Sequence, residues 1–329
     1  MEIAVTGLGV AAADLREPGD LWERMGTRGP DGGPVPREPY DPTPELGRGL
    51  RYKDRATKLA LLAADRALES AGVGARDRAA WAETTAVVAS SNFGNLDTVC
   101  EAASTIGRGS VTDTSPMDLP NASSNVIGSS IAIRHGLRGP NVMLCNGAAS
   151  GLDAVQLGRG LLAAGRAERV LVVGAEAAGP AAARWHGREP HELFDGAAAL
   201  VLEDAEAAAA DGRPGHAWVG GFRRRLDARA SAGAVLAQGA PRPAFWLTGA
   251  WTSPDAVEAG PEPAGAVGGF PPWRDVEAVF GTAFGALGVL QAVAAAQRIA
   301  AHGEASVLLT AGGGAEAAAS LLLTEVSAV

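Results

Sequence analysis

Residues 144–151 read LCNGAASG, and the chain continues as LDAVQLGRGLLAAG. An apolar run, a turn that contains glycine and a regular helical stretch, in this order, predict a strand that turns sharply into a helix. Enzymes mount nucleophiles at such turns because the N-terminus of a helix stabilises negative charge. Here the turn carries Ala148, whose methyl group has no chemistry, and Cys145 stands three residues earlier. The stretch is therefore either a reactive site built on Cys145 or a turn without a nucleophile.

Cys145 lies at the end of an apolar strand rather than at the helix N-terminus, and this position favours a buried structural cysteine. An acyl-transfer site in which Cys145 pairs with a histidine is the alternative. The chain has five histidines: His135, His186, His191, His216 and His302. His135 and His302 are near predicted helix ends, where solvated or capping roles are ordinary. His186 and His191 fall in a loop that is expected at the surface.

The turn must be held by the elements around it, and short apolar runs alternate with longer helical stretches along the chain. Strands are predicted at Ile3–Thr6, Thr85–Ala89, Val142–Cys145, Val170–Val173, Ala198–Glu203, Ala217–Gly220, Ala244–Thr248, Val276–Phe280, Ser306–Ala311 and Ser320–Glu325. Helices are predicted at Asp54–Ser70, Ser123–Arg134, Ser150–Ala164, Asp255–Ala259 and Ala286–Ala301. Several strands are apolar on both faces, which is typical of a sheet covered by helices on both sides. Residues 27–48 and 260–273 are rich in Pro and Gly and are predicted to be surface loops.

The second half of the chain repeats the predicted layout of the first. A strand, a glycine-containing turn and an Ala-rich helix occur at 142–164 and again at 276–301. This echo indicates two halves of related layout, divided near residues 205–216.

Composition limits the classes of function. The 329 residues are 47% hydrophobic, which is enough for a large α/β core, and the formal net charge of -9 argues against general nucleic-acid binding. Two cysteines without a CxxC motif argue against a metal cluster or a disulfide framework, so no metal is expected and a reducing cytoplasm is the expected location. The opening MEIAVTGLGVAAA lacks a basic region and reads as a buried strand rather than a signal peptide. Because no apolar run of about 18 residues lacks helix breakers, no membrane span is expected.

Six stretches, in this order and spacing, resemble the β-ketoacyl synthase family. They are AVTGLGV, RYKDRATKLALLAADRALESAGV, SPMDLPNASSNVIGSSIAIRHGLRGPN, ASGLDAVQLGRGLLAAGRAERVLVVGAEA, FDGAAALVLED and AGGGAEAAASLLL. The resemblance implies an α/β thiolase-like fold, with two pseudo-repeated halves in a layered αβαβα architecture. It places the first half at residues 1–210 and a shortened second half at 211–329. It implies no cofactor.

The family's chemistry needs a cysteine nucleophile and two histidines that polarise a thioester carbonyl. By resemblance, the nucleophile position directly before Ala-Ser-Gly is Ala148 here. The first histidine position, in the stretch PAFWLTGAWTSPDAVEA, falls at Leu247, and the second, in VFGTAFGALG, falls at Thr282. None of these three side chains can do the work, so no catalytic residue is expected.

Without these three reacting groups, the chain resembles the chain length factors of type II polyketide synthases. The resemblance implies a heterodimer with an active ketosynthase that supplies the cysteine and histidines, while this chain shapes the tunnel for the growing acyl chain. A shortened type of the kind that serves polyene formation fits the chain's size. Acyl carrier protein is expected to dock mainly on the partner, because this chain is acidic.

The same resemblance assigns an interface and a tunnel gate. Pro116 and Pro120 fix the backbone of the segment Met117–Asn125, which is expected to reach toward the partner's active site. The residues assigned to the interface and gate are Met117, Leu119, Asn121, Asn125, Val142, Met143, Leu144 and Cys145.

Two other functions stay open beside this one. The chain could be a stand-alone acyl-transfer or thioester-cleaving enzyme that uses Cys145, or an inactive scaffold. The glycine run Gly312–Gly314 lacks the Lys-Ser/Thr of a phosphate-binding loop and is predicted to be a tight turn. The basic cluster Arg223–Arg225 could touch an acidic carrier protein, but a solvated strand end is favoured.

Overall fold

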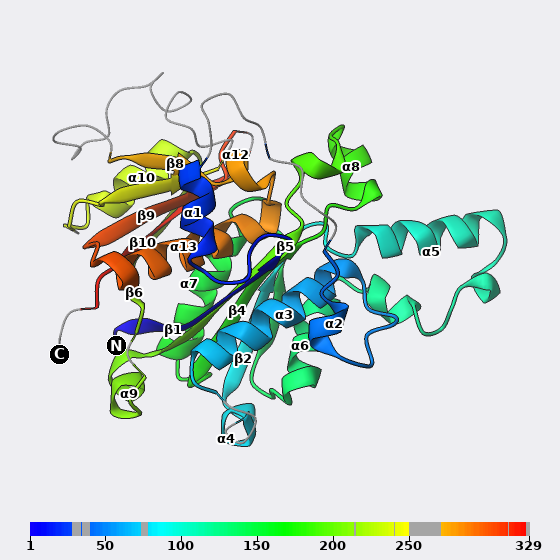
Figure 1. Cartoon of the computed structure of the whole chain (residues 1–329), viewed down its shortest axis with the longest axis horizontal. Helices are drawn as coiled ribbons and strands as arrows, with labels where there is room; N and C mark the ends of the chain where they lie inside the picture. Colours follow the sequence, from blue (N-terminus) through cyan, green and yellow to red (C-terminus); the bar gives the residue numbers. More distant parts are fainter. Residues whose placement is uncertain are drawn as a thin grey trace.

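The computed structural model describes residues 1–27, 34, 40–73, 78–213, 215–239, 241–249, 271–314 and 316–326 (Figure 1). The helix predicted at Asp255–Ala259 lies outside the described residues, as do parts of the loops predicted at 27–48 and 260–273.

Ten described strands are linked by hydrogen bonds in the order β3-β2-β4-β5-β1-β6-β10-β9-β7-β8. Their bounds are β1 Ile3–Ala12, β2 Thr85–Ser90, β3 Asn141–Leu144, β4 Arg169–Glu176, β5 Gly196–Asp204, β6 Ala217–Arg225, β7 Phe245–Thr248, β8 Trp273–Asp275, β9 Ser306–Ala311 and β10 Ala318–Thr324. Counted inward from its own edge, the series β8-β7-β9-β10-β6 repeats the series β3-β2-β4-β5-β1. The two series meet where Ala4 pairs with Trp218 and Val5 with Ala217. This repeat is the layout expected of two related halves, and the boundaries at 1–210 and 211–329 stay predictions.

Helices separate and cover the two series of strands. The α-helices are α1 Asp20–Thr27, α2 Thr43–Leu46, α3 Arg55–Ser70, α4 Arg78–Ala82, α5 Leu96–Arg108, α6 Val126–His135, α7 Ser150–Ala163, α8 Pro180–His186, α9 Ala205–Ala210, α10 Ala228–Leu236, α12 Glu277–Phe280 and α13 Leu287–His302. The 3-10 turns are η1 Val111–Asp113, η2 Leu119–Ala122, η3 Pro190–Glu192 and η4 Phe284–Ala286. The helix α3 packs on β1, β4 and β5, while α7 and α13 pack on each other between the two series, and α10 covers β6 and β10 (Figure 1). The predicted α–β–α–β–α layering is confirmed.

Two glycines explain how closely α3 lies on β1. A Cβ at Gly7 would lie 2.3 Å from the Ala67 carbonyl oxygen, and one at Gly9 would lie 2.2 Å from that of Ala63. The helix begins where Asp54 Oδ1 accepts a 2.7 Å hydrogen bond from the Thr57 backbone N–H, which is an N-cap. The backbone of α3 therefore lies directly against the backbone of β1, in the outer layer that α3 forms on β1, β4 and β5.

The strand β3 is more exposed than β1 and β2. Every residue of β1 and β2 is buried, whereas Asn141 is exposed and the other three residues of β3 are only half-buried. It pairs in parallel with β2 on one side, and no described strand pairs with its other side. An edge strand leaves backbone N–H and C=O groups without partners, which suits it to pair with another chain.

Some predicted elements differ from the structure. The strand predicted at Val276–Phe280 is wrong, because the strand β8 ends at Asp275 and α12 follows directly. The Asp275 carboxylate accepts a 3.0 Å hydrogen bond from the Ala278 backbone N–H, which starts that helix. The helix α5 was not predicted, and none of its residues is buried, so it carries no full apolar face.

One segment tests the expectation that no apolar run could span a membrane. Phe284–His302 is long and apolar enough by length and composition, but most of it is buried. Its helix α13 contacts α7, β5 and β9, so it is a core helix of the fold.

Candidate functional site

The predicted strand–turn–helix at LCNGAASG is confirmed. After β3 the chain passes through Gly147, whose φ of 85° is open to glycine at little cost, and enters α7 at Ser150. Ala148 lies in the turn and lines a cavity of about 440 Å³. Other walls come from Asn92 and Phe93 after β2, Cys145, His186 and Arg188 near the end of α8, Thr282 and Phe284, and Gly312, Gly313 and Glu316.

Two of the three positions assigned to the family's reacting groups meet in this cavity. Thr282 is 8% exposed, its backbone N–H donates to the Glu192 carbonyl over 2.9 Å, and its carbonyl accepts from the Phe194 N–H over 3.0 Å. Leu247 is elsewhere: it lies in β7, is fully buried in the hydrophobic core, and does not line the cavity. The methyl group of Ala148 cannot act as a thiolate nucleophile, and the hydroxyl of Thr282 cannot replace an imidazole.

Glu316 reaches the turn from the last strand connection. Its Oε2 accepts a 3.2 Å hydrogen bond from the backbone N–H of Ala148, at the N-terminal end of α7. A Cβ at Gly147 would lie 2.0 Å from the same oxygen, so a larger residue there would displace the exposed Glu316 carboxylate. The sequence showed a glutamate after the predicted turn at Gly312–Gly314, but nothing in the pattern placed it against position 148.

Cys145 differs from its prediction. It is exposed rather than buried, because it follows the edge strand β3. Its Sγ lies 3.8 Å from the Asn92 carbonyl oxygen. Partial burial, and then the nearby Glu176 carboxylate, raise the pKa of the Cys145 thiol, the opposite of what an activated nucleophile needs.

His186 was expected at the surface, and the structure places it half-buried. It ends α8, lines the cavity, and stacks on Phe284 with ring centroids 4.3 Å apart, while Phe93 meets it edge-on at 4.9 Å. Partial burial, and then Arg188, lower the pKa of His186, so the ring is favoured in its neutral form. Phe284 has a φ of 41°, which is strained for a bulky side chain. An aromatic cluster therefore forms one wall, and its parts come from three segments that the sequence did not connect.

His135 was expected in a solvated or capping role, but it has neither a solvated ring nor an exposed position. Its side chain is buried, with Nε2 3.2 Å from Asp65 Oδ1. The helix α6 packs on α3, and this contact encloses the ring. His191 and His302 are exposed, as expected.

Glu176 is a buried residue that is hydrogen-bonded to the cavity-lining residues Asn92 and Phe93. Its carboxylate accepts hydrogen bonds from the backbone N–H groups of Asn92 (2.6 Å), Phe93 (3.1 Å) and Gly285 (3.1 Å). Complete burial outweighs these bonds and raises the pKa of Glu176 to about 7. The residue joins the loop after β2 to the η4 turn and thereby shapes two walls of the cavity.

The segment Met117–Asn125 lies on the surface near the outer edge of the fold. Met117 is 59% exposed and Leu119 is 40% exposed. Asn121 is buried, and its Nδ2 donates to the Tyr52 carbonyl over 2.6 Å, so it anchors the segment rather than facing outward. Asn125 is exposed just before α6, and its Oδ1 accepts from the Ser123 hydroxyl over 2.6 Å.

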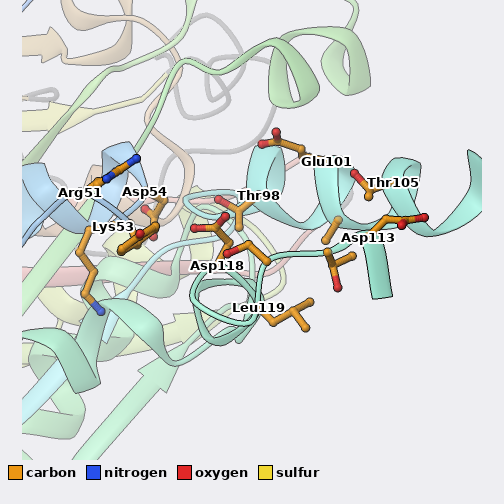
Figure 2. Close-up of a pocket in the computed structure, with 13 residues that line it drawn as sticks. Arg51, Lys53, Asp54, Thr98, Glu101, Thr105, Asp113, Asp118 and Leu119 are labelled. Atoms are coloured by element: carbon orange, nitrogen blue, oxygen red, sulfur yellow. The ribbon is translucent and has the colours of Figure 1, made fainter. Parts of the chain in front are cut away.

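A second, polar cavity of about 350 Å³ lies between this segment and α5 (Figure 2). Thr98, Glu101 and Thr105 line it from α5, and Asp113, Asp118 and Leu119 from the facing segment, with Lys53 and Asp54 at the inner end. Asp54 and Asp113 already cap helical turns, so the acidic lining is partly structural. Across the described parts of the chain, no group of three His, Cys, Asp or Glu side chains could hold a metal ion.

The basic cluster is partly satisfied within the chain. Arg224 forms an ion pair with Asp153 in the first turn of α7, while Arg223 and Arg225 donate to backbone carbonyls. Gly312, Gly313 and Gly314 all have positive φ, as expected of a tight turn.

Part of this sequence is similar to known proteins. The sequence family described as "Beta-ketoacyl synthase, N-terminal domain" matches residues 47–185. A 3-oxoacyl-[acyl-carrier-protein] synthase 2 of Vibrio harveyi is 30% identical over 165 residues, which is 43% of this chain and 40% of that protein. The matched region therefore spans less than half the length of this curated relative.

Solved structures are similar over nearly the whole chain. A structure described as the ishigamide ketosynthase/chain length factor is 25% identical with a TM-score of 0.76, over 99% of this chain and all of that chain. A beta-ketoacyl synthase from Burkholderia phymatum STM815 is 18% identical with a TM-score of 0.81, over 99% of this chain and all of that chain. The predicted thiolase-like ketosynthase fold is confirmed.

Proposed function

We propose that this chain, whose residues 47–185 match the beta-ketoacyl synthase N-terminal domain family, is the non-catalytic subunit of a ketosynthase heterodimer. The observation that carries the proposal is the turn at Ala148. The fold keeps the strand, the turn and the helix that would present a nucleophile, but an alanine occupies the position, and Thr282 faces the same cavity. The scaffold is retained without the groups that condensation needs.

The edge strand β3 supports a pairing role. Its outer side offers unpaired backbone groups, and Val142, Met143 and Leu144 are only half-buried in the isolated chain. The exposed apolar side chain Ile133, at 80% exposure, lies on α6, which contacts β3. Burying such side chains against a partner would stabilise a complex.

The comparison with the ishigamide ketosynthase/chain length factor supports the same role. That structure covers 99% of this chain and matches over its own full length, which supports a role in a complex of this kind. We propose by this similarity that the partner is an active ketosynthase of a type II polyketide synthase. The partner would supply the cysteine and histidines and most of the docking surface for acyl carrier protein.

Within such a pair, Met117 and Leu119 would line or gate the tunnel of the growing chain. Both side chains are exposed and apolar, and Asn121 holds their segment to Tyr52, so the segment is presented in a fixed conformation. We propose a polyketide chain as the product. The small size of this protein fits the variant in which that product is a polyene.

Co-expression with a candidate ketosynthase tests the proposal. Light scattering on the purified sample should give the mass of one copy of each subunit. If this chain stays apart from every ketosynthase encoded beside it and runs as a monomer, the proposal is overturned.

A second function is kept because Cys145 and His186 line the same cavity. A stand-alone acyl transferase would form a thioester on Cys145, with the thiol attacking the acyl carbonyl and the carrier thiol leaving. The raised pKa of the Cys145 thiol speaks against it. Incubation with an acyl carrier thioester, followed by intact mass, separates the two: an adduct that is lost in Cys145→Ala supports the enzyme, and no adduct removes it. An inactive scaffold is the third reading, and it differs from the first only if the chain leaves product length unchanged.

A further inference from the structure

The N-terminal end of α7 already holds an anion from within the chain. Glu316 Oε2 lies 3.2 Å from the backbone nitrogen of Ala148 and accepts its hydrogen bond. The helix is 14 residues long, so its aligned peptide dipoles place partial positive charge at this end. In an active site of this layout, the same end would stabilise a thiolate or the oxygen of a bound carbonyl.

The backbone on both sides is built to admit the Glu316 side chain. Gly147 has a φ of 85°, and a Cβ there would lie 2.0 Å from Glu316 Oε2. The Glu316 N–H donates to the Gly313 carbonyl over 3.2 Å, which folds the connection toward α7. A Cβ at Gly312 would lie 3.3 Å from the Ala149 Cβ, so the glycine turn is in close contact with the start of the helix. Two glycine-dependent backbone segments thus meet around one carboxylate.

Two other charged side chains in this region contact other residues and do not replace the Glu316 carboxylate at the start of α7. Asp153, in the first turn of α7, pairs with Arg224 and accepts a 2.6 Å hydrogen bond from Asn146. Arg188 also lines the cavity, and its guanidinium lies 3.9 Å from the Glu192 carboxylate. Glu316 is the carboxylate that contacts the Ala148 N–H.

We propose that Glu316 is a specificity-determining residue, an internal anion that occupies the place of a ligand's carbonyl or carboxylate oxygen at the N-terminus of α7. A tethered carboxylate competes at high effective concentration with any free one. It also repels a second negative charge at the same point. The end of the cavity at α7 therefore disfavours the negative charge of an acyl group such as a malonyl unit. This inference goes beyond the heterodimer, because pairing through β3 does not require Glu316.

The first experiment measures the field at position 148 with an introduced thiol. Ala148→Cys is made in a chain whose own thiols are removed by Cys100→Ala and Cys145→Ala, and iodoacetamide alkylation is followed against pH. Adding Glu316→Gln keeps the shape and an acceptor oxygen but removes the charge. The thiol pKa should fall by about one unit when Glu316 is replaced, because the helix end then acts on the thiolate alone. Equal pKa values in the two proteins would overturn the proposal.

A second measurement needs no introduced cysteine and serves if the thiol variant does not fold. Butyrate is titrated into the wild-type chain, Glu316→Ala and Glu316→Gln while thermal unfolding is recorded. Butyrate should raise the melting temperature of Glu316→Ala, because binding to the folded state stabilises it, and should leave the wild type unchanged. The proposal is wrong if the wild type and Glu316→Ala respond alike. Methyl butyrate is the neutral control, and it should not discriminate between the two.

Failure here is distinguishable from failure of the proposed function. The thiol pKa and the butyrate response report on the cavity of this chain alone, whereas the heterodimer is read from the mass of the complex.

Discussion

The Glu176 carboxylate accepts a 2.6 Å hydrogen bond from the backbone N–H of Asn92, which lines the same cavity as Ala148. The same carboxylate accepts a 3.1 Å bond from Gly285 N–H, so one buried side chain holds two loops that lie far apart in sequence. Glu176 is fully buried, and its pKa is raised from 4.5 to about 7. This balance between burial and hydrogen bonding has a measurable consequence.

Stability should depend on pH through Glu176. The native state holds the proton up to about pH 7, whereas the unfolded chain releases it near 4.5. Between these values the native state binds more protons, so the free energy of unfolding should fall as pH rises from about 4.5 to about 7. The loss attributable to this group is on the order of 3 kcal/mol. Urea unfolding across this range measures it.

Glu176→Gln is the matched control, because its side chain is neutral at every pH. The difference in unfolding free energy between wild type and variant should change across this window and be flat above it. A difference that does not vary with pH between 4.5 and 7 contradicts the assignment of the raised pKa to Glu176.

Cys145 should be a slow thiol. Partial burial and the Glu176 carboxylate both raise its pKa, so less thiolate is present at neutral pH. In a Cys100→Ala background, the pH profile of alkylation should have its midpoint above the ordinary range of a cysteine. Glu176→Gln should move the midpoint down, toward that range, since it removes the second cause. A midpoint well below the ordinary range would instead mark Cys145 as an activated nucleophile.

Much of the fold could be predicted because its signals are local. Strands such as Ser306–Ala311 and helices such as α3 and α7 show apolar runs or helical spacing, and their bounds agree with the structure to within a few residues. The segment Val276–Phe280 misled because apolar residues there suit a helix as well as a strand, and the Asp275 cap decides between them. The exposed helix α5 was missed because it buries no residue.

The outer edge of β3 should be required for pairing. Pro140 and Leu144 carbonyls accept from β2, so by the alternation of a parallel ladder the N–H of Met143 points away from the sheet. Met143→Pro removes that outward donor, and we expect the affinity for the ketosynthase to fall at least about tenfold, or about 1.4 kcal/mol.

Trp273→Pro is the control for this change. It lies in β8, at the opposite edge of the ten-stranded order, and its own N–H also points away from the neighbouring strand. Titration of labelled partner should show unchanged binding for this variant. If both variants bind as the wild type does, β3 is not the pairing strand.

The segment at Met117 and Leu119 should influence product length. Both side chains are exposed and apolar, so Met117→Trp or Leu119→Trp would fill space that an acyl chain could use. The reconstituted complex should then release shorter products, as read by mass spectrometry. Val111→Trp, an exposed position outside the segment, should leave the length unchanged. An unaltered product from all three variants favours the scaffold reading.

The candidate site was harder to predict than the fold because its contacts join distant segments. The turn at Ala148 and its meeting with Thr282 follow from family spacing, and both were expected. His186 reaches the cavity only because α8 packs beside Phe93 and Phe284, and Glu316 only because a glycine turn directs it back to α7. Leu247 was assigned by spacing from DAVEA, which lies outside the described residues, and β7 places it in the core.

The central claim is that this chain pairs with a ketosynthase and carries no acyl group itself. The most direct measurement is the intact mass of both subunits after the complex is incubated with an acyl carrier thioester. The account predicts an acyl adduct on the ketosynthase, lost when the ketosynthase's own cysteine is replaced, and an unmodified mass for this chain. An adduct on this chain, or condensation by this chain alone, would contradict it.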